Sequence, residues 1–244
     1  MYALQTKNLS KVFGGVHAVD HLSISFEGGK ITGVVGPNGS GKTTLTNVLT
    51  GVHAIDGGAV IIGGDKELEK IASHEVFSLG ISRTFQNVRL FGQMSVLDNL
   101  LLALTKRDIL GAFFEKHSRF HLGQAEETLK RVGLWEKRNE HAENLSYGQR
   151  KLLEIARALA TGAETLFFDE PFAGLFPEMV KRISGIMKEL RAGDQTVILI
   201  EHDMAIIREL CDHVIVLDAG KLLAEGKPEK VLSDPKVIEA YLGV

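Results

Sequence analysis

The sequence predicts an α/β fold with a mostly parallel sheet that is interrupted by a helical insertion. Toward the C-terminus, apolar runs such as TLFFD and TVILI alternate with segments of helical periodicity, which is typical of parallel strands buried on both faces. Between about residues 87 and 160, by contrast, strand signals nearly vanish. With 244 residues, of which 44% are hydrophobic, the chain can bury a sizeable core.

The N-terminal part is predicted to contain short strands, and we expect an antiparallel β subdomain there. The candidate strands are residues 2–9, 22–27, 31–35, 58–64 and 81–86, which are apolar or alternating runs. One helix is expected among them. It starts at Lys42, directly after a glycine-rich stretch, and ends near Thr50 because Gly51 follows.

The middle of the chain shows helical spacing at residues 95–107, 124–135 and 147–160. In the last of these, one face is apolar and carries Leu152, Ile155, Ala156, Leu159 and Ala160. Strands are expected again at residues 165–170, 196–202 and 213–226, with helices between them. We therefore predict one domain over residues 1–244, with a core at 1–86 and 161–244 and a helical subdomain at 87–160.

Composition narrows the class of protein. A formal net charge of -3 provides no broad positive field for nucleic acid, so we expect no nucleic-acid partner. The longest apolar stretches are far shorter than the roughly 20 residues of a membrane helix, so any membrane role is expected to be peripheral. Cys211 lies among apolar neighbours and is expected to be a buried, unreactive thiol in a reducing compartment.

The glycine-rich stretch GPNGSGKTT follows a predicted strand and opens a predicted helix, and it matches the P-loop pattern G-x-x-x-x-G-K-[ST]. Bare backbone lets successive N–H groups curve around an anion at the helix N-terminus. Lys42 is expected to reach the β- and γ-phosphates, Thr43 to bind Mg²⁺, and Thr44 to contact the α-phosphate region. The motif predicts a P-loop NTPase, but it leaves small-molecule kinases, GTP switches, helicases and transport ATPases open.

Polar residues close two further apolar strands at the edge where ligands bind parallel sheets. Asp169 and Glu170 end TLFFDE, so Asp169 is suited to Mg²⁺ and Glu170 to polarising a water for attack on the γ-phosphate. His202 ends TVILIEH and is expected to contact the γ-phosphate. Gln86 closes ISRTFQ, where its amide is expected to touch Mg²⁺ or the attacking water.

A second helix start has the features of an anion site. In LSYGQR, Ser146 is a good N-cap for the amphipathic helix that follows, and Gly148 keeps side-chain bulk away from its first turn. Taken alone, this pattern is also that of an ordinary helix start.

The ordered set GPNGSGKTT, Gln86, LSYGQ, LFFDE and His202 resembles the nucleotide-binding subunit of ABC transporters over essentially the whole chain. The resemblance implies that Phe13 and Ala18 contact the adenine of ATP. It also implies a head-to-tail dimer, in which residues of one chain close over the nucleotide that the P-loop of the other chain binds. The closing residues are Ser146, Gly148 and Gln149, and the binding residues are Asn38, Gly39, Ser40, Gly41, Lys42, Thr43 and Thr44.

Within that family, RTFQNVRLFGQMSVLDNLLLA and LSDPKVIEAYLG resemble the ATPases of branched-chain amino-acid importers. The resemblance implies ATP and Mg²⁺ as cofactors, transmembrane permease subunits as partners, and a periplasmic solute-binding protein as an indirect partner. It also implies a homodimer or a heterodimer with a sister ATPase, attached peripherally to the cytoplasmic face of the inner membrane. Importers of urea or short amides, lipopolysaccharide exporters and ABC-type ATPases outside transport remain alternatives.

Two positions depart from the family pattern. Tyr147 stands where the signature commonly has glycine, and Phe176 stands where aspartate or asparagine is common. Phe176 removes a polar group expected near the dimer interface, which leaves hydrogen bonding between the two sites open.

Overall fold

The computed structural model describes residues 1–84, 88–104 and 119–242. Its strands are β1 (Tyr2–Phe13), β2 (Val16–Leu22), β3 (Ser25–Glu27), β4 (Ile31–Val35), β5 (Gly57–Ile62), β6 (Lys66–Leu68), β7 (Ile81–Arg83), β8 (Thr165–Asp169), β9 (Thr196–Ile200), β10 (His213–Asp218) and β11 (Lys221–Gly226). Its helices are α1 (Lys42–Leu49), α2 (Val96–Leu104), α4 (Arg119–Val132), α5 (Tyr147–Ala160), α6 (Pro177–Ala192), α7 (Met204–Leu210), α8 (Pro228–Val231) and α9 (Pro235–Leu242). Two 3-10 turns, η1 (Trp135–Lys137) and η2 (Ala142–Asn144), precede α5.

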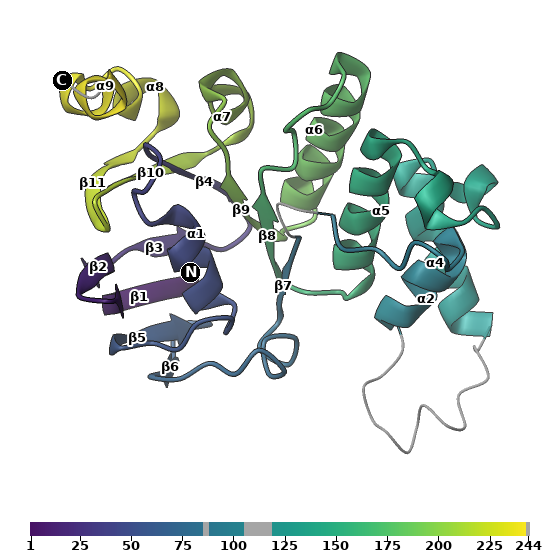
Figure 1. Cartoon of the computed structure of the whole chain (residues 1–244), viewed down its shortest axis with the longest axis horizontal. Helices are drawn as coiled ribbons and strands as arrows, with labels where there is room; N and C mark the ends of the chain where they lie inside the picture. The colour runs from purple at the N-terminus through teal and green to yellow at the C-terminus, as the bar shows by residue number, and fades with distance from the viewer. Residues whose placement is uncertain (85–87, 105–118, 243–244) are drawn as a thin grey trace. The chain divides into compact units, whose positions relative to one another are not determined.

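The described strands form two sheets, and the predicted fold class is confirmed (Figure 1). The first sheet has the order β2-β1-β5-β6, with β3 paired to β1, and its pairings are antiparallel. The second has the order β11-β10-β4-β9-β8-β7, in which the edge strand β11 pairs antiparallel and the other neighbours pair parallel. The predicted strand at 31–35 is therefore an interior strand of the parallel sheet, which explains why all of its residues are buried.

Two sequence expectations need correction in detail. Residues 213–226 form a hairpin of two strands, because Ala219 and Gly220 have positive φ angles of 44° and 80° and reverse the chain. On the predicted apolar face of α5, Leu152, Ile155 and Ala156 are buried, while Leu159 and Ala160 are only half-buried near the C-terminal end of the helix.

One hydrophobic core lies between the two sheets, with α1 between them (Figure 1). Phe26 from β3, Leu49 from α1 and Phe167 from β8 belong to the same buried cluster, and each is at most 1% exposed. Full burial of such a side chain stabilises the fold by about 1.5–3 kcal/mol. Helices α7, α8 and α9 cover the opposite face of the parallel sheet (Figure 1). Packing of α1 into this core therefore holds the start of the helix, and the glycine-rich loop before it, in place.

The chain divides into two compact units. One comprises Met1–Arg83, Glu164–Glu170 and Met187–Val244, and the other comprises Thr84–Ala163 and Pro171–Ile186. The first part of α6 thus groups with the helical unit, whereas the sequence analysis placed residues 171–186 with the core. The domain boundaries derived from the sequence remain a prediction.

The helical unit contains α2, α4 and α5, which contact one another pairwise. Asn99 of α2 is fully buried, and its amide donates to the carbonyl oxygens of Phe91 and Ser95, both at 3.0 Å. Its carbonyl oxygen accepts from the Phe91 backbone N–H at 3.0 Å. A buried amide with these partners holds the segment before α2 in one conformation.

None of the described helices is long and apolar enough to span a bilayer. Cys211 is buried, as expected, and burial raises the pKa of its thiol to about 12. A thiol with that pKa stays protonated at neutral pH, so it is a poor nucleophile.

Candidate active site

The loop between β4 and α1 requires glycine at two positions, for steric reasons. A Cβ on Gly36 (φ 151°) would lie 2.2 Å from the carbonyl oxygen of Leu217, and one on Gly41 (φ 100°) would lie 2.2 Å from that of Ala18. Gly39 (φ 81°) differs, because a Cβ there would meet nothing within 4 Å. The loop therefore packs tightly on its inner side and is open on its outer side, as a backbone anion site requires.

Lys42, the first residue of α1, folds back over this loop. Its ammonium donates to the carbonyl oxygens of Gly36 at 2.7 Å and Pro37 at 2.9 Å, and to Ser40 Oγ at 3.4 Å. Burial lowers the pKa of Lys42, while the carboxylates of Glu170 and Asp169 oppose that shift. The ammonium of Lys42 therefore lies against the carbonyl oxygens of the phosphate loop.

The predicted acidic residues lie at the end of β8. Asp169 is 3% exposed, and Glu170 follows it with a positive φ of 47°. Its backbone N–H donates to the carbonyl oxygen of Ile200 in β9 at 3.0 Å. This left-handed conformation is uncommon for a residue with a side chain and is a form of strain found at functional sites.

His202 approaches Glu170 from the end of β9. Its Nδ1 lies 4.0 Å from Glu170 Oε1 and 3.7 Å from Glu201 Oε2. Glu201 is 2% exposed and accepts from the His202 backbone N–H at 3.1 Å, so it fixes the start of the turn that carries the histidine. Glu201 was not among the predicted site residues, although a carboxylate directly after the apolar run TVILI was a usable signal.

Arg83 at the end of β7 was also missed. Its guanidinium donates to Asn47 Oδ1 at 2.8 Å and Thr50 Oγ1 at 2.9 Å in and beside α1, and it lies 3.5 Å from Asp169 Oδ2. The side chains of Arg83 and Asp169 are only 9% and 5% exposed. Arg83 therefore joins the helix of the phosphate loop to the strand that carries the acidic pair.

Replacing Arg83 with methionine is expected to lower the free energy of unfolding by about 3–5 kcal/mol, because it removes the cation of a buried ion pair. Urea denaturation measures this change. Thr50→Val is the matched control, because it removes one acceptor of the same guanidinium and is expected to cost about 1 kcal/mol. Equal stabilities of the two variants would show that Arg83 does not compensate the charge of Asp169.

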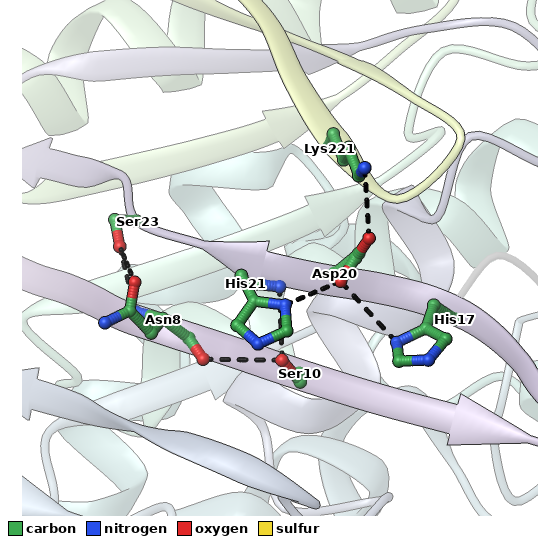
Figure 2. Close-up of polar contacts among 7 residues, drawn as sticks. All are labelled: Asn8, Ser10, His17, Asp20, His21, Ser23 and Lys221. Carbon is green, nitrogen blue, oxygen red and sulfur yellow. Dashed lines mark hydrogen bonds and ion pairs between the residues drawn. The ribbon is translucent and has the colours of Figure 1, made fainter.

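Strand β2 and the β10–β11 turn contact the phosphate loop from the other side. The backbone N–H of Asp20 donates to the Gly220 carbonyl oxygen at 2.9 Å, and the N–H of Gly220 donates to that of Ser40 at 3.1 Å. The Asp20 carboxylate contacts His21 Nδ1 at 2.7 Å and Lys221 Nζ at 3.2 Å (Figure 2). His21 and Lys221 hold the pKa of this carboxyl below its ordinary value. The carboxylate thus adds a side-chain link between β2 and the turn at Gly220.

The residues predicted to contact adenine lie on these strands. Phe13 ends β1 and is 43% exposed, and Ala18 lies in β2 with its carbonyl oxygen toward Gly41. Of the predicted phosphate and Mg²⁺ contacts, Asn38 and Thr43 are exposed and Thr44 is half-buried. Gln86, the predicted contact of Mg²⁺ or the attacking water, lies outside the described residues.

Ser146, in the helical unit, caps α5 as expected. Its Oγ accepts from the Gln149 backbone N–H at 3.3 Å, and its own N–H donates to Gln149 Oε1 at 3.0 Å, which completes a capping box. A Cβ on Gly148 would lie 3.1 Å from Met179 Cγ, so the space beside this turn is tight. Tyr147, in the first turn of α5, is 43% exposed, and Phe176, the residue before α6, is 81% exposed.

Two protein-family models match this chain. Residues 19–173 match the family model described as ABC transporter. Residues 221–244 match the model described as branched-chain amino acid ATP-binding cassette transporter.

Individual relatives agree with these matches. The chain is 39% identical to the high-affinity branched-chain amino acid transport ATP-binding protein LivG of Escherichia coli (strain K12), over 98% of this chain and 97% of the relative. It is 39% identical to the corresponding protein BraF of Pseudomonas aeruginosa, with the same coverage. It is also 39% identical to a probable LivG of Archaeoglobus fulgidus, over 100% of this chain and 96% of the relative.

Solved structures extend the likeness to the fold. The ADP conformation of MJ1267, an ATP-binding cassette of an ABC transporter, superimposes with a TM-score of 0.88 at 37% identity and covers 100% of both chains. A dimeric post-hydrolysis state of the cassette MJ0796, bound to ADP and phosphate, superimposes with a TM-score of 0.79 at 25% identity, over 92% of this chain and 98% of the other.

Proposed function

Because this chain belongs to the ABC transporter family of ATP-binding proteins, we propose that its ATPase activity powers the import of branched-chain or other hydrophobic amino acids. The observation that carries the solute class is the match of residues 221–244 to the branched-chain amino acid cassette family. The 39% identity to LivG over 98% of the chain supports the same class. In this proposal the amino acid passes through separate membrane subunits.

The phosphate loop and Lys42 bind the triphosphate in this mechanism. The loop offers backbone N–H groups on its open side at Gly39, and the Lys42 ammonium exchanges its bonds to Gly36 and Pro37 for phosphate oxygens. Phe13 stacks on the adenine and Ala18 contacts it. Asn38, Ser40, Gly41 and Thr44 complete the contacts with the nucleotide.

Thr43 and Asp169 fit Mg²⁺ as ligands, because the cation prefers oxygen donors and keeps several waters and phosphate oxygens in its shell. The Thr43 residue is exposed in the first turn of α1, and the Asp169 carboxylate is held at the end of β8 by Arg83. When bound, Mg²⁺ neutralises charge on the phosphates. We propose Gln86 as a further ligand, from outside the described residues.

Hydrolysis requires a group that accepts a proton from water. We assign this role to Glu170, whose carboxylate takes the proton while the water oxygen attacks the γ-phosphorus and the bond to the ADP oxygen breaks. His202, 4.0 Å from Glu170, contacts the γ-phosphate and orients the carboxylate. Lys42 stays protonated and compensates the phosphate charge.

Two copies of an ABC cassette are needed for a complete site in this proposal. Ser146, Gly148 and Gln149 of one chain cover the ATP that the loop of the other chain binds, as in a homodimer or in a pair with a sister ATPase. Permease subunits contact the segment after Gln86, up to about Leu100, and a periplasmic binding protein acts through them. The assembly places the chain peripherally on the cytoplasmic face of the inner membrane.

Transport in proteoliposomes tests this function. The chain is reconstituted with the permease subunits and the solute-binding protein that the proposal requires, and uptake of labelled leucine is followed. We expect ATP-dependent uptake that isoleucine and valine reduce and urea does not. Glu170→Gln in the same assembly is expected to abolish uptake. ATP-driven extraction of lipopolysaccharide, or ATP hydrolysis that the permease subunits never influence, would overturn the proposal.

A further inference from the structure

Phe13 exposes an aromatic ring next to open space. The ring is 43% exposed, and Gly14 and Gly15 follow it with φ angles of 54° and 86°. A Cβ at either glycine would meet nothing within 4 Å. Because Gly14 and Gly15 carry no side chains, the two residues after Phe13 do not cover its exposed ring with side-chain atoms.

His53 contacts the same ring from the end of the phosphate-loop helix. The two ring centroids lie 5.2 Å apart at an interplanar angle of 74°, which is the T-shaped geometry that aromatic pairs prefer. The backbone N–H of His53 donates to the Asn47 carbonyl oxygen in α1 at 3.1 Å. Because His53 is tied to α1, the ring of Phe13 keeps its place relative to the phosphate loop.

Lys11 provides a second contact with the ring. It is only 9% exposed, and its ammonium lies 5.2 Å from the Phe13 centroid and 3.0 Å from Asp56 Oδ1. Asp56 also accepts from the Val12 backbone N–H at 2.8 Å, and its own N–H donates to the Ser10 carbonyl oxygen at 3.1 Å. The bond from Val12, followed by that from Lys11, lowers the pKa of Asp56, so this carboxylate stays charged at neutral pH.

These contacts differ from ordinary surface packing. A lysine is almost never this deeply buried unless it is paired, and here the pairing places its charge beside an aromatic ring. A single exposed phenylalanine at the end of a strand would otherwise sample several rotamers and lose that freedom on binding a ligand. Contacts from His53 and Lys11 remove much of this entropic cost before a ligand arrives.

We propose that His53 and Lys11 are positioning residues that hold the Phe13 ring ready to stack on the purine base of the nucleotide. The proposal rests on the proposed function, because it takes Mg·ATP as the ligand. It assigns affinity for the base to this aromatic and cationic contact, and affinity for the triphosphate to the phosphate loop. The two parts of the ligand can therefore be tested separately.

Binding of Mg·ATP and of magnesium tripolyphosphate, which lacks the base, tests the proposal by calorimetry. Phe13→Ala is expected to weaken ATP binding roughly 5- to 150-fold. His53→Ala is expected to weaken it roughly 2- to 10-fold, because one aromatic contact is lost. Both variants are expected to bind tripolyphosphate like the unmodified chain. In steady-state hydrolysis, His53→Ala should raise KM for ATP by the same factor and leave kcat unchanged.

Three further variants separate positioning from a general loss of structure. His53→Phe keeps a ring at this position and is expected to restore ATP affinity. In the Phe13→Ala background, His53→Ala should have no additional effect, because its action passes through the Phe13 ring. His74→Ala, at an exposed position elsewhere in the same unit, is the matched control and should change nothing.

Equal losses of ATP and tripolyphosphate affinity in His53→Ala, or unchanged ATP affinity, would overturn the proposal. Failure of the unmodified chain to bind either ligand would instead overturn the proposed function on which it rests.

Discussion

Replacing Glu170 with glutamine is expected to lower kcat for ATP hydrolysis about 10²- to 10⁴-fold, while the affinity for ATP changes little. An amide has nearly the shape of a carboxylate but cannot take the proton from the attacking water. Glutamine also has the same branching as glutamate at Cβ, so the substitution should not change the strain of the left-handed backbone at φ 47°. Phosphate release and binding of a fluorescent ATP analogue measure the two quantities.

The same variant is expected to accumulate a dimer in the presence of ATP, because nucleotide joins two chains and hydrolysis no longer separates them. Gel filtration with and without Mg·ATP detects that species. Glu69→Gln is the control, because Glu69 is an exposed carboxylate directly after β6. This variant should behave like the unmodified protein. Near-normal turnover in Glu170→Gln would contradict the assignment of the proton acceptor.

Much of the fold could be predicted because its signals are local in the sequence. TLFFD and TVILI are short apolar runs with every residue buried, and they form two neighbouring parallel strands of the second sheet. Asp169 ends the first strand and His202 follows the second by two residues, so both lie at one edge, because parallel strands end on the same side. The start of α1 could also be predicted, because a glycine-rich stretch typical of a tight loop directly precedes it.

Contacts between distant segments could not be predicted in the same way. Arg83 and Asp169 are separated by 86 positions, and no periodicity links them. A charged residue inside a predicted strand was the available signal, but it does not identify the partner of that residue. The contact between Phe13 and His53 likewise depends on how the end of α1 packs beside β1. Such pairings are set by tertiary packing and not by local propensity.

In the proposed site, different kinds of residue bind the base and the phosphates of the nucleotide. Contacts near Phe13 involve aromatic and paired charged groups, whose geometry favours a flat ligand. Contacts near Lys42 involve backbone groups and a concentrated positive charge, which favour an anion. A substitution near the base should therefore leave the affinity for the phosphates unchanged. A substitution of Lys42 should instead weaken the binding of any ligand that contains the phosphates.

Replacing Lys42 with methionine is expected to weaken binding of Mg·ATP about 10- to 150-fold, which corresponds to the loss of one hydrogen bond to a charged group. Methionine keeps the length and much of the apolar contact of the lysine stem, so the loop is expected to keep its shape. Binding of magnesium tripolyphosphate should fall by the same factor, because both ligands use the ammonium. Calorimetry on both ligands measures this pair of changes.

Lys66→Met is the matched control for Lys42→Met, because Lys66 is an exposed lysine in the β6 strand of the same unit. It removes the same charge from the chain, so it accounts for any effect of net charge on an anionic ligand. Unchanged ATP affinity in Lys42→Met would contradict the phosphate-binding role of the loop. A loss confined to ATP, with tripolyphosphate bound as before, would contradict it as well, because it would place the ammonium beside the base.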